Sequence, residues 1–286
     1  MKRKLVLTAA LALAITSCAT MEGPDLSGMT FSDEPLIGKV IWHDLVTEDM
    51  NAARQFYGGL FGWTFEDGAS RNGNDYVVAR DGNVYVAGIV SVAPRADGQN
   101  LSRWLPYLSV ADVDKAVGHG VEAGATVVVA AQDVPFGRVA AIIDSDGAVV
   151  GLARSKIGDP DDRTTRAGPG RPVWDELLAN DPGSAAQFYR IVAGYDFRVI
   201  ERRGGEYTML SGDGVDRAGL FKKPSPEMSA TWLTHFGVPD PAAAAQRAKE
   251  LGGTILLPAS PDLRDGTIAV VTDPAGAVLV LHQASS

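Results

Sequence analysis

The sequence predicts an α+β protein made of two tandem copies of one domain. Two stretches, 41–63 (IWHDLVTEDMNAARQFYGGLFGW) and 173–195 (VWDELLANDPGSAAQFYRIVAGY), carry Trp, Asp and Phe-Tyr at a constant offset of 132 residues. A period this long indicates a duplicated domain, because solenoid repeats are only about 20–50 residues long. The total length of 286 residues also fits two domains.

Each copy contains an internal repeat, so the chain holds four units. WLPYLSVAD at 104–112 corresponds to WLTHFGVPD at 232–240, and a helical segment follows each of them. Each copy closes with Asp-x-x-Gly and an apolar run, DSDGAVVGLA from 144 and DPAGAVLVLH from 273. We therefore expect four units, each consisting of a strand, a helix and further strands.

The first element of the chain is an export signal. Residues 2–4 (KRK) are basic, residues 5–15 are apolar but too few to span a bilayer, and the segment ends in Ile-Thr-Ser before Cys18. This ending resembles a bacterial lipobox, which implies a signal peptide over 1–17 and a lipidated Cys18. Ala19 follows the cysteine, which in Gram-negative lipoproteins implies sorting to the outer membrane. We expect a lipid-anchored, periplasm-facing protein of the cell envelope; the alternative is an ordinary signal peptide with an incidental cysteine.

Glycine, proline and polar residues mark the domain boundaries. Residues 18–36 are polar and interrupted by Gly and Pro, so they predict a lipidated N-terminus followed by a tether. Residues 157–172 (IGDPDDRTTRAGPGRP) hold three Pro and three Gly without an apolar period, which indicates an interdomain linker. The two domains are then expected over 37–156 and 173–286.

Two of the predicted helices have clear start signals. Asp49 and Asp181 each precede an Ala-rich amphipathic segment, where an aspartate side chain can accept hydrogen bonds from the free N–H groups of the first turn. The apolar residues of the first segment recur at three- and four-residue spacing and form one face: Ala53, Phe56, Tyr57 and Leu60. The repeated Phe-Tyr pair is therefore predicted to belong to the core.

Composition excludes several classes of function. The net charge is −9, and it becomes −12 once the signal peptide with its three basic residues is removed. A protein this acidic and without a basic stripe is not expected to bind nucleic acid. Cys18 is the only cysteine, so neither disulfides nor a catalytic thiol are expected. The chain also lacks the glycine-rich phosphate loops and the nucleophile elbow of common enzyme classes.

The repeated pattern D-x-x-x-A-x-x-F-Y-x-x-x-x-G-[WY], together with the closing Asp-x-x-Gly strands, resembles the vicinal oxygen chelate superfamily. This group includes glyoxalase I, bleomycin-resistance proteins and extradiol dioxygenases, and the resemblance covers residues 37–283. It implies four βαβββ modules that form two glyoxalase-like, cup-shaped sheets with the helices outside and a site inside each cup. Whether adjacent modules pair within a half or between halves is left open.

Enzymes of this family hold a divalent metal with a His on the first strand of a module and a Glu on the last strand. The metal polarises the substrate and stabilises an anionic intermediate. The positions that correspond to these ligands hold other residue types here: Trp42, Leu105, Trp174 and Leu233 for His, and Gly88, Gly151, Gly219 and Val280 for Glu. None of them is a metal ligand, so no metal or other cofactor is expected at the usual positions.

The leading hypothesis is a protein that binds a small apolar or aromatic molecule in one or both cups. Trp42 and Trp174 would form flat walls. Residues two apart on a strand share a face, which places four further residues in the cups: Asp44 and Glu176, as orienting groups or general bases, with Tyr107 and His235.

Two alternatives remain. Glu176, His235 and His282 have the composition of a displaced metal site, which would make the protein a metal-dependent glyoxalase- or dioxygenase-type enzyme. The cups could instead be filled, in which case the protein would be a structural envelope lipoprotein. His43 is expected on the opposite face of its strand, toward a helix, and is assigned no role. Catalytic activity and oligomeric state are left open.

Overall fold

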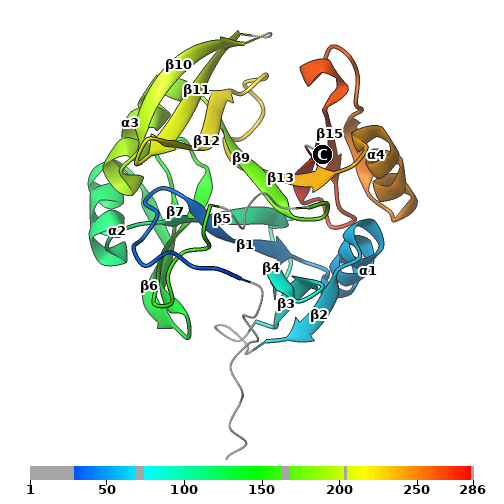
Figure 1. Cartoon of the computed structure of the whole chain (residues 1–286), viewed down its shortest axis with the longest axis horizontal. Coiled ribbons are helices and arrows are strands. Elements are labelled where there is room, and N and C mark those ends of the chain that lie inside the picture. Colours follow the sequence, from blue (N-terminus) through cyan, green and yellow to red (C-terminus); the bar gives the residue numbers. More distant parts are fainter. Residues whose placement is uncertain (1–28, 69–73, 163–167, 203–204, 285–286) are drawn as a thin grey trace, which may run out of the picture.

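The computed structural model describes residues 29–68, 74–162, 168–202 and 205–284. The signal peptide and Cys18 therefore lie outside the described residues. The described chain forms two eight-stranded mixed sheets, one from each half of the sequence, together with four α-helices (Figure 1). This confirms the predicted α+β architecture of two glyoxalase-like domains.

The first sheet has the strand order β2-β3-β4-β1-β5-β8-β7-β6. Its central strands β1 and β5 are antiparallel, while β1 pairs parallel with β4 and β5 pairs parallel with β8. The elements, in chain order, are β1 (Val40–Thr47), α1 (Met50–Phe61), β2 (Thr64–Asp67), β3 (Tyr76–Asp81), β4 (Val84–Ser91), β5 (Arg103–Ser109), α2 (Val113–Glu122), β6 (Thr126–Val134), β7 (Gly137–Ile143) and β8 (Val149–Ser155).

The second sheet repeats this topology strand for strand, in the order β10-β11-β12-β9-β13-β16-β15-β14. The two modules of each half thus share one sheet, so modules pair within a half. The elements are β9 (Pro172–Ala179), α3 (Pro182–Ala193), β10 (Asp196–Arg202), β11 (Gly205–Gly212), β12 (Val215–Lys222), β13 (Thr231–Val238), α4 (Pro241–Glu250), β14 (Thr254–Leu257), the 3₁₀ turn η1 (Arg264–Gly266), β15 (Ile268–Thr272) and β16 (Val278–Gln283).

All four helices begin at an aspartate cap. The side chain of each cap accepts hydrogen bonds from backbone N–H groups of the first turn, at Asp49, Asp112, Asp181 and Asp240. The helices α1 and α3 end at Gly62 and Gly194, which adopt the left-handed conformation that glycine takes without a steric cost. Within the described residues, every helix is too short or too polar to cross a membrane.

The helices lie outside the cups and join the two halves. α2 packs against α3, and α1 packs against α4, so each helix pair contains one helix from each half (Figure 1). The two large core clusters accordingly mix residues of both halves: Leu108 with Tyr189, and Phe56 with Leu279. The repeated Phe-Tyr pair is buried, as predicted for a core position.

Residues 29–36, the described end of the predicted tether, pack against the predicted linker. Phe31 forms an isolated bridge with Pro160, and the Leu36 N–H donates to the carboxylate of Asp159 at 2.7 Å. Asp159 is completely buried and also accepts from the Ser109 hydroxyl. The chain entering the first domain and the chain leaving it are therefore fixed side by side.

Candidate functional site

The first cup contains a hydrogen-bonded group of a tryptophan, a carboxylate and a tyrosine. Trp42 and Asp44 come from β1, and Tyr76 comes from β3. The Trp42 indole N–H and the Tyr76 hydroxyl both donate to Oδ1 of Asp44, each at 2.8 Å. Asp44 is buried, whereas Trp42 is half-buried.

The second cup repeats this arrangement with corresponding residues of the other half. Trp174 and Glu176 lie on β9, and Tyr207 lies on β11. The Tyr207 hydroxyl donates to Oε1 of Glu176 at 2.6 Å, and the Trp174 indole N–H donates to the Tyr207 oxygen at 3.1 Å. The structure therefore places two equivalent Trp–carboxylate–Tyr groups, one in each cup.

Glycines next to the carboxylates make room for these tyrosines. Gly88 pairs with Asp44, and Gly219 pairs with Glu176, in the parallel strand pairs β1–β4 and β9–β12. A Cβ atom at either glycine would overlap the hydroxyl of Tyr76 or of Tyr207. A tyrosine hydroxyl therefore occupies the space that a longer side chain would need at these two positions.

The predicted residue Tyr107 has the same relationship to a third glycine. Tyr107 pairs with Gly151 on β8, and its ring lies where a Cβ of Gly151 would stand. Tyr107 is almost fully buried and packs with Leu105 in a small cluster on the floor of the first cup. It is thus part of the wall of the cup and not an exposed contact group.

In the second cup the group extends to three cationic or imidazole side chains. Nε2 of His235 lies 3.1 Å from Oε2 of Glu176, and the Arg264 guanidinium donates to Oε1. Nδ1 of His235 lies 3.3 Å from Nδ1 of His282, on the neighbouring parallel strand β16. Glu176 and His235 are buried, while Arg264 and His282 are partly exposed at the cup surface.

Burial and neighbouring charges set the protonation states of the side chains in the second cup. Burial by itself would raise the pKa of Glu176, but the hydrogen bond and charge of His235, together with the charge of Arg264, hold that pKa at about 2. Burial, followed by the charges of His235 and Arg264, lowers the pKa of His282 to about 4. Burial and the neighbouring Glu176 raise the pKa of Tyr207. At neutral pH the cup therefore holds a carboxylate, an unprotonated His282 and a phenol.

The three residues of the predicted displaced metal site come together, and Glu176 is already engaged by other side chains of the cup. Both oxygens of Glu176 are engaged, and one of them is bound by the Arg264 cation. A divalent cation would stand beside that guanidinium. Across the part of the chain that the structure describes, no group of three His, Cys, Asp or Glu side chains is arranged to hold a metal.

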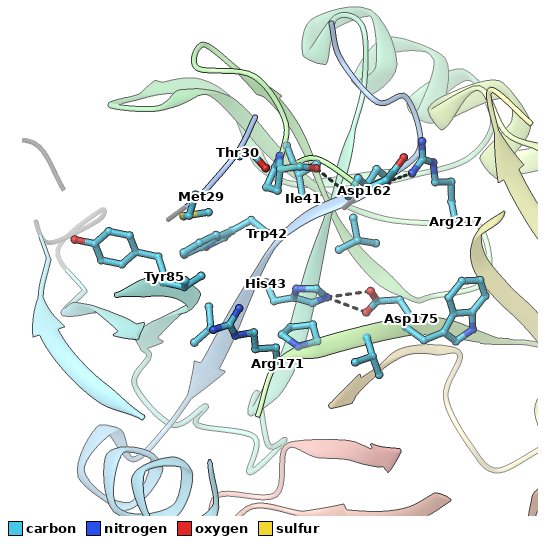
Figure 2. Close-up of a pocket in the computed structure, with 18 of the residues that line it drawn as sticks. Met29, Thr30, Ile41, Trp42, His43, Tyr85, Asp162, Arg171, Asp175 and Arg217 are labelled. Atoms are coloured by element: carbon cyan, nitrogen blue, oxygen red, sulfur yellow. Dashed lines mark hydrogen bonds and ion pairs between the residues drawn. The ribbon is translucent and has the colours of Figure 1, made fainter. Parts of the chain in front are cut away.

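A cavity of about 480 Å³ lies between the two halves (Figure 2), and its lining includes His43 and Asp175 as well as the cup tryptophans Trp42 and Trp174. Figure 2 shows His43 and Asp175 facing one another in the middle of this interdomain cleft. Nε2 of His43 lies 3.0 Å from both carboxylate oxygens of Asp175, and the Thr234 hydroxyl donates to the same carboxylate at 2.8 Å. All three side chains are buried.

The expectation for His43 was wrong in part. The side chain does lie on the face opposite Trp42, but it meets the other half of the protein and not a helix. His43 and Asp175 occupy the same position of the two repeats, 132 residues apart. In a reciprocal interface equivalent positions meet at the axis, so this offset was the signal that could have located the contact.

Three residues of the cups were missed by the sequence reasoning. Tyr76 and Tyr207 lie at matched positions of the two halves, and a search for every matched polar residue would have found them. Arg264 has no counterpart of that kind. It is the first residue of the 3₁₀ turn η1 and has a left-handed backbone conformation (φ 48°), which only the folded loop reveals.

Comparisons with known proteins agree with this architecture. The model of the Glyoxalase/Bleomycin resistance protein/Dioxygenase superfamily matches residues 39–160, and the model of the glyoxalase-like domain matches residues 173–282. This chain belongs to that superfamily. A curated relative, "Putative glyoxylase CFP32" of Mycobacterium tuberculosis, is 34% identical over 242 residues, which cover 83% of this chain and 91% of the relative.

Other members of the superfamily are more distant. The anthracycline biosynthesis protein DnrV of Streptomyces peucetius is 27% identical over 257 residues, covering 84% of this chain and 91% of that protein. The Mn(II)-bound glyoxalase from Novosphingobium aromaticivorans has a TM-score of 0.56 at 17% identity and covers 88% of this chain and 84% of its own. The 2,3-dioxygenase LapB from Pseudomonas sp. KL28 has a TM-score of 0.54 at 13% identity, covering 90% and 94%. These two structures are similar in fold.

Proposed function

We propose that this member of the superfamily binds a small, largely apolar or aromatic molecule in its cups without using the family's metal ion. The matched Trp–carboxylate–Tyr groups carry this proposal. Their tryptophans stand at positions where the family resemblance implies a metal-binding His, and a tyrosine hydroxyl takes the space beside Gly88 and Gly219, where the resemblance implies a Glu. A side chain that fills this space and donates a hydrogen bond to the carboxylate competes with a metal for the same oxygen.

The second cup is the stronger candidate of the two. A buried charged network is costly for stability unless every member is paired, and such networks cluster at functional sites. Here the network around Glu176 includes the partly exposed His282 and Arg264, and the Tyr207 hydroxyl links it to the half-buried Trp174. A flat apolar wall with a few convergent polar groups is typical of small-molecule sites.

The names of two relatives support an aromatic ligand. Two Streptomyces proteins that match most of this chain are named as anthracycline biosynthesis proteins, and anthracyclines are planar aromatic molecules. An aromatic ring could stack on Trp42 or Trp174, a contact that contributes about 0.5–1.5 kcal/mol beyond its buried area.

The test begins with the metal content of the chain that starts at Ala19, expressed without a histidine tag. We expect no stoichiometric Fe, Mn, Ni or Zn by elemental mass spectrometry, even after soaking and desalting. Anthraquinone-2-sulfonate is then titrated while tryptophan fluorescence is followed. Quenching is expected, and it should weaken in Trp174→Leu more than in Trp42→Leu if the second cup is the site.

Three outcomes would overturn the proposal. One tightly held metal per chain that is lost in His235→Ala would favour the displaced site and a metal-dependent enzyme. No binding of any aromatic probe would favour filled cups and a structural envelope protein. Binding that survives both tryptophan substitutions unchanged would show that the pocket has been placed wrongly.

We also propose that the mature protein is held at a membrane by lipid on Cys18, on the basis of the lipobox-like sequence. In a Gram-negative host, the full chain should fractionate with the outer membrane and incorporate labelled palmitate. Cys18→Ser should do neither. Equal membrane association of both forms would contradict this proposal.

A further inference from the structure

The interdomain cleft has the size and composition of a second small-molecule site, which contains His43 and borders the cups at Trp42 and Trp174. Its volume of about 480 Å³ lies within the range of roughly 300–1,000 Å³ that is usual for ligand pockets. Equivalent residues of the two halves line it, including Ile41 with Val173 and Val84 with Val215. The walls are therefore largely apolar, and Figure 2 shows Trp42 and Tyr85 on one side of the cleft.

Both halves contain a β-bulge at the edge of this cleft. The register of β1 against β5 shifts between Val40 and Trp42, and that of β9 against β13 shifts between Pro172 and Trp174. Bulges re-aim the side chains of a strand and are frequent beside binding sites. The extra residues, Ile41 and Val173, both line the cleft.

His43 offers a hydrogen-bond acceptor in the middle of the cleft. The Asp175 carboxylate faces Nε2 and is itself oriented by the Thr234 hydroxyl, so the network assigns the ring proton to Nε2. Nδ1 is then an acceptor. Nδ1 makes no hydrogen bond to any residue that the structure describes. It also keeps some accessible surface, because it is not one of the fully buried, unpaired side-chain atoms of those residues.

A cationic group lies across the cleft from this acceptor. The side chain of Arg217 is only 4% exposed and forms an ion pair with Asp162, and Lys39 binds the same carboxylate. Nε of Arg217 is buried without a partner among the described residues. Positive charge beside an acidic hydroxyl favours the partial negative charge on its oxygen.

From these features we infer that the interdomain cleft binds a planar phenolic molecule, whose hydroxyl donates a hydrogen bond to Nδ1 of His43. The apolar walls take the ring, and His43, held by Asp175, selects for a ligand with a donor. An aromatic compound without the hydroxyl would fill the same space and leave Nδ1 unpaired, which costs binding energy.

The test compares 4-nitrophenol with 4-nitroanisole, its methyl ether, by titration calorimetry on the chain that starts at Ala19, at pH 6, where the phenol keeps the proton that it donates. One such hydrogen bond predicts about five- to thirty-fold tighter binding of 4-nitrophenol. The double variant His43→Phe/Asp175→Asn removes the acceptor without leaving a buried carboxylate unpaired. It should bind both probes with the weaker affinity.

The location is tested with a substitution at the rim. Val215 is 43% exposed and lines the cleft, so Val215→Trp should fold and weaken binding of both probes at least ten-fold. Val199→Trp, at a 55% exposed position on β10 outside the cleft, is the matched control and should leave both affinities unchanged. Equal affinity of the wild type for the two probes, no binding of either, or full binding by Val215→Trp would each overturn the inference.

Discussion

Tyr57 and Tyr189 occupy the same place in the two halves of the chain, and each donates its hydroxyl to an aspartate of the opposite half. Tyr57 reaches Oδ2 of Asp273 at 3.2 Å, and Tyr189 reaches Oδ2 of Asp144 at 2.8 Å. The two motifs that repeat most clearly in the sequence, Phe-Tyr and Asp-x-x-Gly, are therefore partners across the interface between the halves.

The first prediction concerns this reciprocal pair. Tyr57→Phe and Tyr189→Phe should each lower the free energy of unfolding by about 1–3 kcal/mol, because a buried aspartate loses a hydrogen-bond donor. Urea unfolding at pH 7 measures the change. Tyr85→Phe is the control, since the Tyr85 hydroxyl contacts Glu66 at the surface, and it should change stability by less than about 0.5 kcal/mol.

The same experiment tests whether the halves depend on each other. Because both core clusters mix residues of the two halves, unfolding should occur in one transition by fluorescence and by circular dichroism. Two separated transitions, or a tyrosine variant as stable as the wild type, would contradict the shared core.

The second prediction concerns the glycine beneath Tyr207. Gly219→Ala should destabilise the protein by about 1–3 kcal/mol, because its Cβ would overlap the Tyr207 hydroxyl in a packed site. Gly118→Ala is the matched control: a Cβ there meets nothing within 4 Å, and alanine should stabilise helix α2 by about 0.5–1 kcal/mol. Denaturant titration measures both.

A double variant then isolates the cause. If the hydroxyl is what blocks the space, Tyr207→Phe should reduce the cost of Gly219→Ala, giving a coupling energy in the double-mutant cycle. Purely additive effects would show that the Tyr207 hydroxyl is not the cause of the destabilisation by Gly219→Ala.

The parts of the fold that repeat in the sequence could be predicted. Duplicated motifs identified four modules, and the aspartates before the helices were caps because their side chains suit that position. Strand alternation also put Glu176, His235 and His282 on one face, since residues two apart share a face, and the structure brings these three side chains into contact.

The rest depended on contacts between segments far apart in the chain. The pairing of modules follows from the strand contacts β1–β5 and β9–β13, and no single segment encodes it. Arg264 was invisible because it lies in an irregular loop, outside any apolar period. The contact between His43 and Asp175 needed the relative placement of the halves, which each strand pattern leaves undetermined.

The last prediction concerns the pH dependence of stability around His282. Its pKa is lowered to about 4 by burial and by the charges of His235 and Arg264, whereas an unfolded histidine titrates near 6.5. Between these values the unfolded chain binds a proton that the folded chain does not, so folding stability falls as the pH drops from about 6.5 to 4. His282 should contribute about 2 kcal/mol to that fall, somewhat less than the full shift because its side chain is partly exposed.

Removing the imidazole in His282→Leu should therefore flatten the pH dependence of stability. When urea unfolding is measured at pH 7 and at pH 4.5, the variant should lose less stability than the wild type between the two. Comparing each variant with the wild type at the same pH cancels the other titrating groups, including Asp144 and Asp273, whose pKa values burial raises. A slope in His282→Leu equal to that of the wild type would contradict the burial of an unprotonated His282.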